Sequence, residues 1–477
     1  MKRYIFLLLN FLVFIFFCIS CNKKNEDSSS PYISINIDNC DESGVVRISS
    51  GATELLVRIT CNRSWTVDGS TGWCNVSPAS GKGISQAGSV ETVKINIGEN
   101  PNPEVRKINL IFLSSGIQKE ISIWQAGNVA EGTESWETAI ETVENMRIGW
   151  NLGNTLDSHG EWIAINTPGR PSDYETAWGN PVTTQEMINK FKQAGFNVIR
   201  VPVTWYQHID ESGKVDEIWM QRVEEVVTYV LNAGMYCILN VHHDTGASKQ
   251  TWLKADWDMY PDIKQRFRYL WQQIATRFNK YDDHLIFEAY NEILDKNNSW
   301  NESKDHLSYK AANTLLQDFV DVVRATGGNN TRRNLCVNTY AASHRENNLA
   351  NFELPKDMTE NHLMVQFHDY SPYKFALDKD DPKVDFNEQD AAEIALTMKR
   401  MYDFFCSKHI PVVLGEFAAT DKNNMPERVK HAACVVREAS RYGIVCIHWM
   451  GLLDRRTMLW NEPEIVDAMF DNLPGKR

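Results

Sequence analysis

The sequence predicts a (β/α)8 barrel, a TIM barrel, preceded by a small all-β domain of the immunoglobulin-like sandwich type. From residue 136 onward, short apolar, β-branched runs typical of buried parallel strands alternate with longer stretches of helical period. Roughly eight such strand–helix units over about 340 residues match the size of a TIM barrel. Residues 32–128 instead carry short alternating runs between Gly and Ser clusters, which favours a sandwich.

Eight apolar runs are the expected barrel strands. They are residues 148–153, 198–203, 237–241, 285–290, 335–337, 363–367, 412–414 and 444–447. The expected helices between them include residues 184–194, 215–233, 263–278, 311–326, 391–407 and 426–442. Gly195, Gly234 and Gly443 stand just past three of these helices, where glycine readily adopts the left-handed conformation that ends a helix. A doubly wound open sheet competes, but it needs a glycine-rich phosphate loop, and neither GxGxxG nor GxxxxGK[ST] occurs.

The all-β domain is expected to contain five strands with clear alternation of apolar and polar residues. They are residues 33–37, 54–61, 90–97, 107–113 and 120–124. Residues 22–31 are Lys, Asn, Ser and acidic residues ending in Pro31, a composition typical of a flexible tether. The predicted domains are therefore residues 32–128 for the sandwich and 136–477 for the barrel.

Residues 1–21 are predicted to be a lipoprotein signal peptide. Lys2 and Arg3 precede an apolar run of about 16 residues, too short to span a membrane and suited to a signal-peptide core. Cys21 follows this run and a small residue, which resembles a bacterial lipoprotein processing site, although Cys18 stands where that pattern usually has leucine. We therefore expect export, lipidation of Cys21 and a surface-exposed location on the outer membrane.

Charge and cysteine content exclude some classes of function. The formal net charge of -13 argues against a nucleic-acid binder, whereas a neutral polymer is an acceptable partner for an acidic surface. A monomer is expected. Among the 10 cysteines the one CxxC pair is Cys18 and Cys21 of the predicted signal peptide, and no further cysteine pair has zinc-site spacing, so a zinc site is not indicated. Five are expected to be free and buried, namely Cys237, Cys336, Cys406, Cys434 and Cys446. One disulfide among Cys40, Cys61 and Cys74 is possible, and the sequence does not decide whether it forms.

Polar residues follow the predicted barrel strands at the point where each strand ends. They are Arg200, His242-His243-Asp244, Asn291-Glu292, His368-Asp369-Tyr370, Glu416 and His448-Trp449. One such group alone is explained by a satisfied structural contact. Because the C-terminal ends of TIM-barrel strands carry the active site, six together predict a single functional site.

Two carboxylates beside an aromatic ring and several hydrogen-bond donors suit cleavage of a glycosidic bond. One carboxylic acid protonates the leaving oxygen, and a second carboxylate attacks the anomeric carbon from about 5 Å away in a retaining enzyme. We expect Glu292 to be the acid/base and Glu416 the nucleophile, with Arg200 keeping Glu416 ionised and Tyr370 donating to it. His242-His243-Asp244 supplies two-thirds of a metal site, but no third ligand follows at a suitable spacing, and no metal or cofactor is expected.

The barrel resembles glycoside hydrolase family 5, in particular its endoglucanase and xyloglucanase branch. The matching stretches are residues 149–157 (GWNLGNTLD), 175–181 (ETAWGNP), 200–205 (RVPVTW), 240–244 (NVHHD), 287–292 (FEAYNE) and 414–417 (LGEF). The resemblance implies that Asn291 hydrogen-bonds the sugar 2-hydroxyl and that Trp449 is the platform beneath the sugar. It also implies that Arg200, His242, His368 and Tyr370 position the two glutamates, and that His243, Asn154 and Trp178 line neighbouring subsites.

Two positions depart from the family pattern. Ile293 follows Glu292 where the family usually has proline, which relaxes a turn and removes no catalytic atom. Residues 449–453 read WMGLL rather than the common Trp-Trp-Asp-Asn, which changes a loop beside the sugar-binding subsites and bears on the glucan preferred.

The sandwich resembles the BACON domain of carbohydrate-active proteins of Bacteroidota. The matching stretches are residues 61–67 (CNRSWTV), 72–74 (GWC), 77–81 (SPASG) and 121–127 (ISIWQAG). Trp65 and Trp73 are sugar platforms if the domain binds glycans and core residues if it is a spacer. We favour the spacer, because tryptophan beside alternating strands usually faces the core.

These features together predict a surface-tethered retaining endo-β-1,4-glucanase or xyloglucanase that acts on plant β-glucan polysaccharides or oligosaccharides. A β-mannanase or mixed-linkage glucanase on the same fold is the nearest alternative. A non-catalytic glycan-binding lipoprotein is an alternative of another class.

Overall fold

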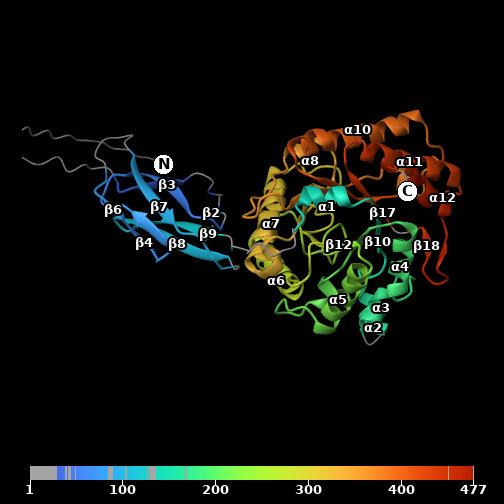
Figure 1. The fold of residues 1–477 in the computed structure, drawn as a ribbon, viewed down its shortest axis with the longest axis horizontal. Coiled ribbons are helices and arrows are strands. Elements are labelled where there is room, and N and C mark those ends of the chain that lie inside the picture. Colours follow the sequence, from blue (N-terminus) through green and yellow to red (C-terminus); the bar gives the residue numbers. More distant parts are fainter. Residues whose placement is uncertain are drawn as a thin grey trace, which may run out of the picture. The chain divides into compact units, whose positions relative to one another are not determined.

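The computed structural model describes residues 30–37, 40, 44–48, 50–83, 90–102, 105–125, 127, 136–166, 169–449 and 451–475. They include an N-terminal β-sheet unit and a larger barrel unit, drawn in Figure 1. The expected signal peptide, Cys21 and nearly all of the expected tether lie outside the described residues. Among the described helices, none has the length and apolar character needed to cross a membrane.

The N-terminal unit consists of two β-sheets, as the alternating pattern predicts. One sheet has the order β1 (Ile33–Ile37), β3 (Thr53–Cys61), β7 (Glu91–Ile97), β5 (Cys74–Ser77). The other has the order β2 (Val45–Ile48), β9 (Ile117–Gln125), β8 (Arg106–Ser114), β4 (Trp65–Asp68), β6 (Ser80–Gly81). All five expected strands are present. Strictly alternating burial along β4, β5 and most of β7 gives each sheet one apolar face.

The two tryptophans of this unit differ in burial. Trp65 is 1% exposed, and its indole Nε1 donates to Glu91 Oε2 at 2.9 Å. Gly81 packs so closely that an added Cβ would lie 2.4 Å from that nitrogen. Trp65 is therefore a core residue, as predicted, whereas Trp73 is only half-buried.

No disulfide joins the eight cysteines in the described part of the chain. The bridge left open among Cys40, Cys61 and Cys74 does not form in this structure, and the Cys61 thiol donates to the Arg63 carbonyl instead. Cys406 is half-buried rather than buried, and the other four barrel cysteines are buried as expected.

Eight parallel strands close into a barrel, which confirms the predicted fold and excludes the open sheet. In order they are β10 (Ile148–Asn151), β11 (Val198–Val201), β12 (Tyr236–Asn240), β13 (Leu285–Glu288), β14 (Leu335–Asn338), β15 (Leu363–His368), β16 (Val412–Phe417) and β17 (Val445–Trp449). β17 pairs with β10 to close the ring, aligning Trp449 with Asn151. A short hairpin, β18 (Leu453–Asp454) and β19 (Leu459–Trp460), follows β17.

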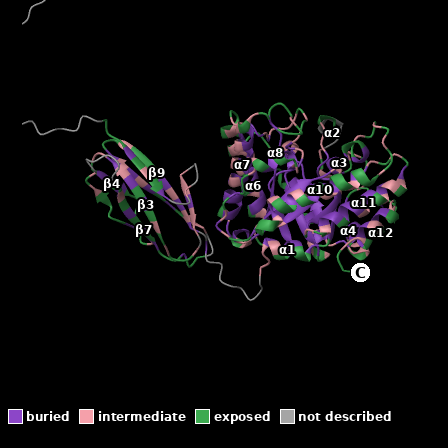
Figure 2. Ribbon diagram, turned by 90° about the horizontal axis from the view of Figure 1, so that it is seen from above, coloured by how far each residue is buried: buried purple, intermediate pink, exposed green. Residues whose placement is uncertain are grey.

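All six expected helices are present and form part of the outer ring. They are α4 (Gln185–Ala194), α5 (Glu217–Asn232), α6 (Tyr260–Arg277), α7 (His306–Ala325), α10 (Glu388–Phe404) and α11 (Met425–Ser440). The described residues also form α1 (Ala139–Asn145), α2 (Glu161–Asn166), α3 (Pro171–Glu175), α8 (Glu346–Ala350), α9 (Tyr373–Ala376) and α12 (Pro463–Asp471). Figure 2 shows buried residues gathered inside the barrel unit and exposed ones on the outer helix faces.

Candidate active site

The two predicted catalytic glutamates meet at the C-terminal ends of the barrel strands. Glu416 lies in β16 and is buried, and Glu292 follows β13 and is half-buried. One oxygen of each carboxylate and one ring nitrogen of His368 all lie within 4.8 Å of one another. This separation fits the spacing of about 5 Å that a retaining glycosidase needs.

His368 lies between the two carboxylates. Its Nδ1 is 2.8 Å from Glu292 Oε1 and 3.5 Å from Glu416 Oε2. The Gln366 amide nitrogen lies 3.4 Å from the other ring nitrogen, Nε2. A hydrogen on Nδ1 is in position to be donated to Glu292.

A local irregularity brings His368 and Glu416 together. The register between β15 and β16 shifts after Phe367, so that His368 pairs with Glu416 across the two strands. Gly415 is required at this point, because a Cβ there would lie 2.3 Å from the Gln366 side chain. A bulge beside an active site is a common way of aiming a side chain.

Two donors hold the Glu416 carboxylate. Arg200 Nη1 donates to Oε1 at 2.7 Å, and the Tyr370 hydroxyl donates to Oε2 at 2.9 Å. Burial raises the pKa of Glu416, the positive charges of His368 and Arg200 oppose that rise, and the charge of Glu292 adds to it. Burial, and then the charge of Glu416, raises the pKa of Tyr370, so its hydroxyl remains a donor. Both contacts agree with the sequence prediction.

Glu288, which the sequence reasoning missed, is the second acidic partner of Arg200. Its two oxygens accept from Arg200 Nε at 2.7 Å and from Nη2 at 2.8 Å, and both side chains are fully buried. Nη2 also donates to Asn291 Oδ1 at 2.9 Å, which fixes the orientation of that amide. The missed signal is a glutamate inside an apolar strand, because a fully buried carboxylate requires a partner.

His242 is held in one tautomer. Asn240 Nδ2 lies 3.1 Å from His242 Nδ1 and also donates to Glu288 Oε1 at 3.1 Å, while Asn240 Oδ1 accepts from the Val203 amide. Asn240 therefore presents an N–H to His242, whose Nδ1 accepts. Burial, with the charges of His243 and Arg200, lowers the pKa of His242 well below its usual range. The neutral ring thus carries its hydrogen on Nε2 as a donor.

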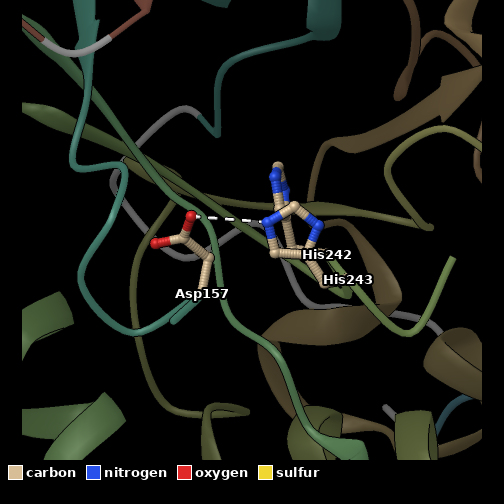
Figure 3. Close-up of side chains that lie close together, drawn as sticks. All are labelled: Asp157, His242 and His243. Atoms are coloured by element: carbon tan, nitrogen blue, oxygen red, sulfur yellow. Dashed lines mark ion pairs between the residues drawn. The ribbon is translucent and has the colours of Figure 1, made fainter. Parts of the chain in front are cut away.

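Figure 3 shows Asp157, a potential third ligand that precedes the histidines in the sequence, close to His242 and His243. His243 Nε2 lies 3.7 Å from Asp157 Oδ2, and one ligand atom of each residue lies within 4.8 Å of the others. Asp157 comes from the loop after β10, which sequence spacing from the histidines does not reveal.

The hydrogen bonds around these residues do not fit a metal ion. A histidine that binds metal through Nε2 donates its Nδ1 hydrogen to an acceptor, whereas Asn240 offers His242 a donor. Asp244 is also committed elsewhere. It accepts from the Trp205 amide at 2.7 Å and from Trp252 Nε1 at 2.6 Å, and burial raises its pKa to about 6. Asp244 therefore joins two loops.

The aromatic residues predicted near the sugar lie in two groups. Trp449 is half-buried and its indole lies parallel to the His242 ring, with centroids 5.6 Å apart. The ring centroid of Trp178 lies 5.6 Å from that of His243 and 5.2 Å from that of His159. His159 is a residue that the sequence prediction missed. These residues all come from loops or strand ends on the same side of the barrel.

Asn154 lies beside this group in a left-handed backbone conformation, with φ of 54°. Its amide donates to Asp157 Oδ2 at 3.1 Å, and its carbonyl accepts from Asn180 at 2.8 Å. All the predicted site residues of the barrel therefore lie at the C-terminal ends of the strands. The missed His159 is part of the same loop as Asn154 and Asp157.

Comparison with known proteins identifies both units. The family model described as cellulase (glycosyl hydrolase family 5) matches residues 156–451, and the BACON model, described as a putative N-terminal binding domain, matches residues 63–126. The chain is 39% identical over 353 residues to the cellulase/esterase CelE of Acetivibrio thermocellus, covering 70% of this chain and 40% of that protein. It is 35% identical over 354 residues to endoglucanase A of Ruminococcus albus, covering 70% of this chain and 93% of that protein. The chain thus spans well under half of the first relative and nearly all of the second.

Solved structures of family 5 enzymes are also similar to this chain. A family 5 glycoside hydrolase of Prevotella bryantii, in complex with a xyloglucan tetradecasaccharide, matches at 42% identity and a TM-score of 0.66, covering 70% of this chain and 98% of that one. A broad-specificity endoglucanase of Ruminococcus champanellensis with bound cellotriose matches at 41% identity and a TM-score of 0.67, covering 71% and 99%. A Bacteroides ovatus xyloglucanase, at 24% identity and a TM-score of 0.66, shares the fold over 92% of this chain and 99% of its own.

Proposed function

The chain belongs to glycosyl hydrolase family 5, and on that premise we propose that it is a retaining endo-β-1,4-glucanase or xyloglucanase. The observation that carries the proposal is the approach of Glu292, His368 and Glu416 to within 4.8 Å. Two carboxylates this close leave no room for a water molecule between sugar and base, so the second carboxylate attacks directly.

The reaction proceeds in two displacements. Glu292 gives its proton to the glycosidic oxygen while a Glu416 oxygen bonds to the anomeric carbon, and the bond to the leaving sugar breaks. Glu292, now a carboxylate, takes a proton from water. The water oxygen then bonds to the anomeric carbon and releases Glu416, so the product keeps the β configuration.

Neighbouring side chains support this division of roles. The donors Arg200 and Tyr370 at 2.7 and 2.9 Å orient Glu416 and stabilise its charge. His368 at 2.8 Å positions Glu292. Asn291, with its oxygen taken by Arg200, directs its amide hydrogens to the sugar 2-hydroxyl. Trp449 forms the platform beneath the sugar, and His242 contributes its Nε2 hydrogen.

The substrate we propose is the neutral β-1,4-glucan backbone, including its xylose-branched form. The xyloglucan oligosaccharide and the cellotriose bound to the two relatives at 42% and 41% identity support this choice. The rings of Trp178, His159 and His243 extend the site along one side and suit contacts with further sugar units. Mannan and mixed-linkage glucan are the nearest other substrates.

We also propose that the protein is a lipoprotein of the outer membrane, anchored through Cys21 and facing outward. The apolar run before Cys21 carries this proposal. Labelling of cells with a radioactive fatty acid tests it: the wild-type protein should carry label, and Cys21→Ser should not. Label retained in Cys21→Ser contradicts it.

Hydrolysis by the protein from residue 22 onward tests the enzymatic proposal. Xyloglucan, carboxymethylcellulose, mixed-linkage glucan and mannan are incubated with wild type and Glu416→Ala, and reducing ends are counted. Wild type should release ends fastest from a β-1,4-glucan, and Glu416→Ala should release none. A folded wild type that binds these polymers for hours without shortening them would be a glycan-binding protein instead.

The acid/base has its own test. Glu292→Ala should lose activity on polysaccharides but should still cleave an aryl glycoside with a dinitrophenolate leaving group, which departs without a proton. Added azide should restore turnover of that substrate and give a β-glycosyl azide. An α-azide product instead would place the nucleophile at Glu292.

A further inference from the structure

Glu288 occupies the last position of β13, four residues before Glu292, and is fully buried. Arg200 approaches it with two nitrogens, Nε and Nη2, but approaches Glu416 with Nη1 alone. A bidentate pair of this kind is the stronger of the two arrangements. Arg200 thus stands between two carboxylates and is bound more tightly to the one that does not face the substrate.

The other contacts of Glu288 are neutral amides. Asn240 Nδ2 donates to Oε1 at 3.1 Å, and Asn338 Nδ2 lies 3.5 Å from the same oxygen. The ionisable groups that interact with Glu288 are Arg200, His368 and the buried Cys336 thiol. No other cation is paired with Glu288 among the described residues.

We propose that Glu288 is a positioning residue that takes the larger share of the Arg200 charge, and so limits how strongly Arg200 stabilises the Glu416 carboxylate. The inference rests on the proposed function, in which Glu416 is the nucleophile. A carboxylate that a neighbouring cation neutralises strongly is a poorer nucleophile. Sharing the Arg200 charge with Glu288 therefore keeps Glu416 reactive while Arg200 stays in place.

The charge states of the two glutamates agree with this division. Burial disfavours the ionised form of both. For Glu288 the charge and hydrogen bonds of Arg200 outweigh burial, and the pKa is lowered. For Glu416 burial outweighs the opposing charges of His368 and Arg200, and the pKa is raised. The pKa of Glu288 thus lies below its ordinary value and that of Glu416 above it, in line with the unequal contacts that Arg200 makes with the two.

The groups that face Glu416 come from several elements. They are Arg200 from β11, His368 from β15, Glu292 and Tyr370 from the loops after β13 and β15, and Asn151 from β10 through Arg200. Substituting Glu288 leaves all of these in place. It removes a negative charge beside Arg200 and His368, both of which favour the Glu416 carboxylate, so the effect on Glu416 has a definite sign.

Glu288→Gln should make Glu416 ionise at lower pH, because the whole Arg200 charge then acts on it. The acidic limb of the rate should move down by about one pH unit. The maximal rate of the first displacement should fall, because the nucleophile is less basic. KM should stay near the wild-type value, since Glu288 contacts no substrate. Glu288→Asp keeps the charge but withdraws it from Arg200, so it should shift the limb less, in the same direction.

The experiment follows inactivation by 2,4-dinitrophenyl 2-deoxy-2-fluoro-β-cellobioside between pH 4 and 8. The dinitrophenolate leaves without protonation, so the rate reports Glu416 and not Glu292. Glu175→Gln is the matched control, because Glu175 is another fully buried glutamate held by two nitrogens of one arginine, Arg222, at 2.9 Å each. This control should keep the wild-type pH limb.

The outcomes separate the two proposals. If the wild type is not labelled at Glu416, the proposed function itself fails. If it is labelled and both Glu288 variants keep the wild-type limb, or move it upward, the positioning role is overturned. A downward shift in Glu288→Gln, smaller in Glu288→Asp and absent in Glu175→Gln, supports it. Should Glu288→Gln not fold, the Glu288→Asp profile alone decides by the same criterion.

Discussion

The ring of His242 lies parallel to the indole of Trp449, with 5.6 Å between centroids and 6° between the planes. His242 is buried and held by Asn240, whereas Trp449 is half-buried. The rigid imidazole therefore sets the orientation of the tryptophan. The proposed function assigns the remaining part of the indole surface to a sugar ring.

The first prediction separates the two members of this pair. Trp449→Ala should lower kcat/KM for a β-glucan by about 10- to 100-fold, because it removes most of an aromatic contact surface. His242→Phe keeps a ring against Trp449 and loses the Nε2 hydrogen together with the Nδ1 acceptor of Asn240, so it should lower kcat more than it raises KM. Initial rates on cellotetraose measure both. Equal effects of both substitutions on KM alone would argue against the assigned roles.

The second prediction concerns Tyr370, whose hydroxyl donates to Glu416 Oε2 at 2.9 Å. Tyr370→Phe removes a hydrogen bond to a charged group, worth about 1.5–3 kcal/mol, or roughly 10- to 100-fold in rate. The loss disfavours the Glu416 carboxylate, so its pKa, already raised by burial, rises further. The acidic limb of the pH–rate profile should move upward. A limb that stays in place would mean that the hydroxyl acts on the substrate and not on Glu416.

The sequence predicts most of this site because a TIM barrel turns strand ends into neighbours. Arg200 and Glu416 are 216 residues apart in the sequence, and Glu292 lies between them. Each of the three follows an apolar run, and the barrel brings them together. The helices were predicted within a few residues for the same reason, since their apolar faces must cover the strands.

What the sequence does not reveal is which polar groups pair inside the barrel. Glu288 was read as part of an apolar strand, and Asp157 as part of a loop motif. A buried carboxylate in one strand requires a partner of opposite charge, and a buried arginine in another strand can be that partner. Their side chains point inward only in the observed register, which one-dimensional spacing does not specify.

The third prediction tests whether the N-terminal unit is a spacer. Trp65 is 1% exposed and hydrogen-bonded to Glu91, so it has no free face for a sugar. The barrel fragment of residues 136–477 should hydrolyse soluble xyloglucan with a kcat/KM within about twofold of the protein from residue 22, because a separate domain keeps its own core. Affinity electrophoresis of the isolated N-terminal unit in xyloglucan should show no retardation. Retardation that Trp73→Ala abolishes would instead identify the half-buried Trp73 as a sugar contact.

The fourth prediction concerns stability at acidic pH. The His208 ring is buried, stacks on Trp219 at 3.6 Å, and has its pKa lowered by burial to about 3. The folded state therefore binds fewer protons than the unfolded chain between about pH 3 and 6.5, so stability is complete above pH 6.5 and falls as the pH drops through that window. At pH 5 the cost from His208 is roughly 2 kcal/mol of unfolding free energy.

Urea unfolding at pH 7 and pH 5 measures this cost. His208→Phe keeps an aromatic ring on Trp219 and removes the ionisable group, so the difference between the two pH values should shrink by roughly 2 kcal/mol relative to wild type. His306→Gln is the control, because His306 is exposed at the start of α7. The difference should not disappear entirely, because burial also lowers the pKa of His159 and of His362 to about 4, and each adds cost in the same direction. An unchanged difference in His208→Phe would show that protons bind elsewhere on unfolding, and would remove His208 as a source of acid sensitivity.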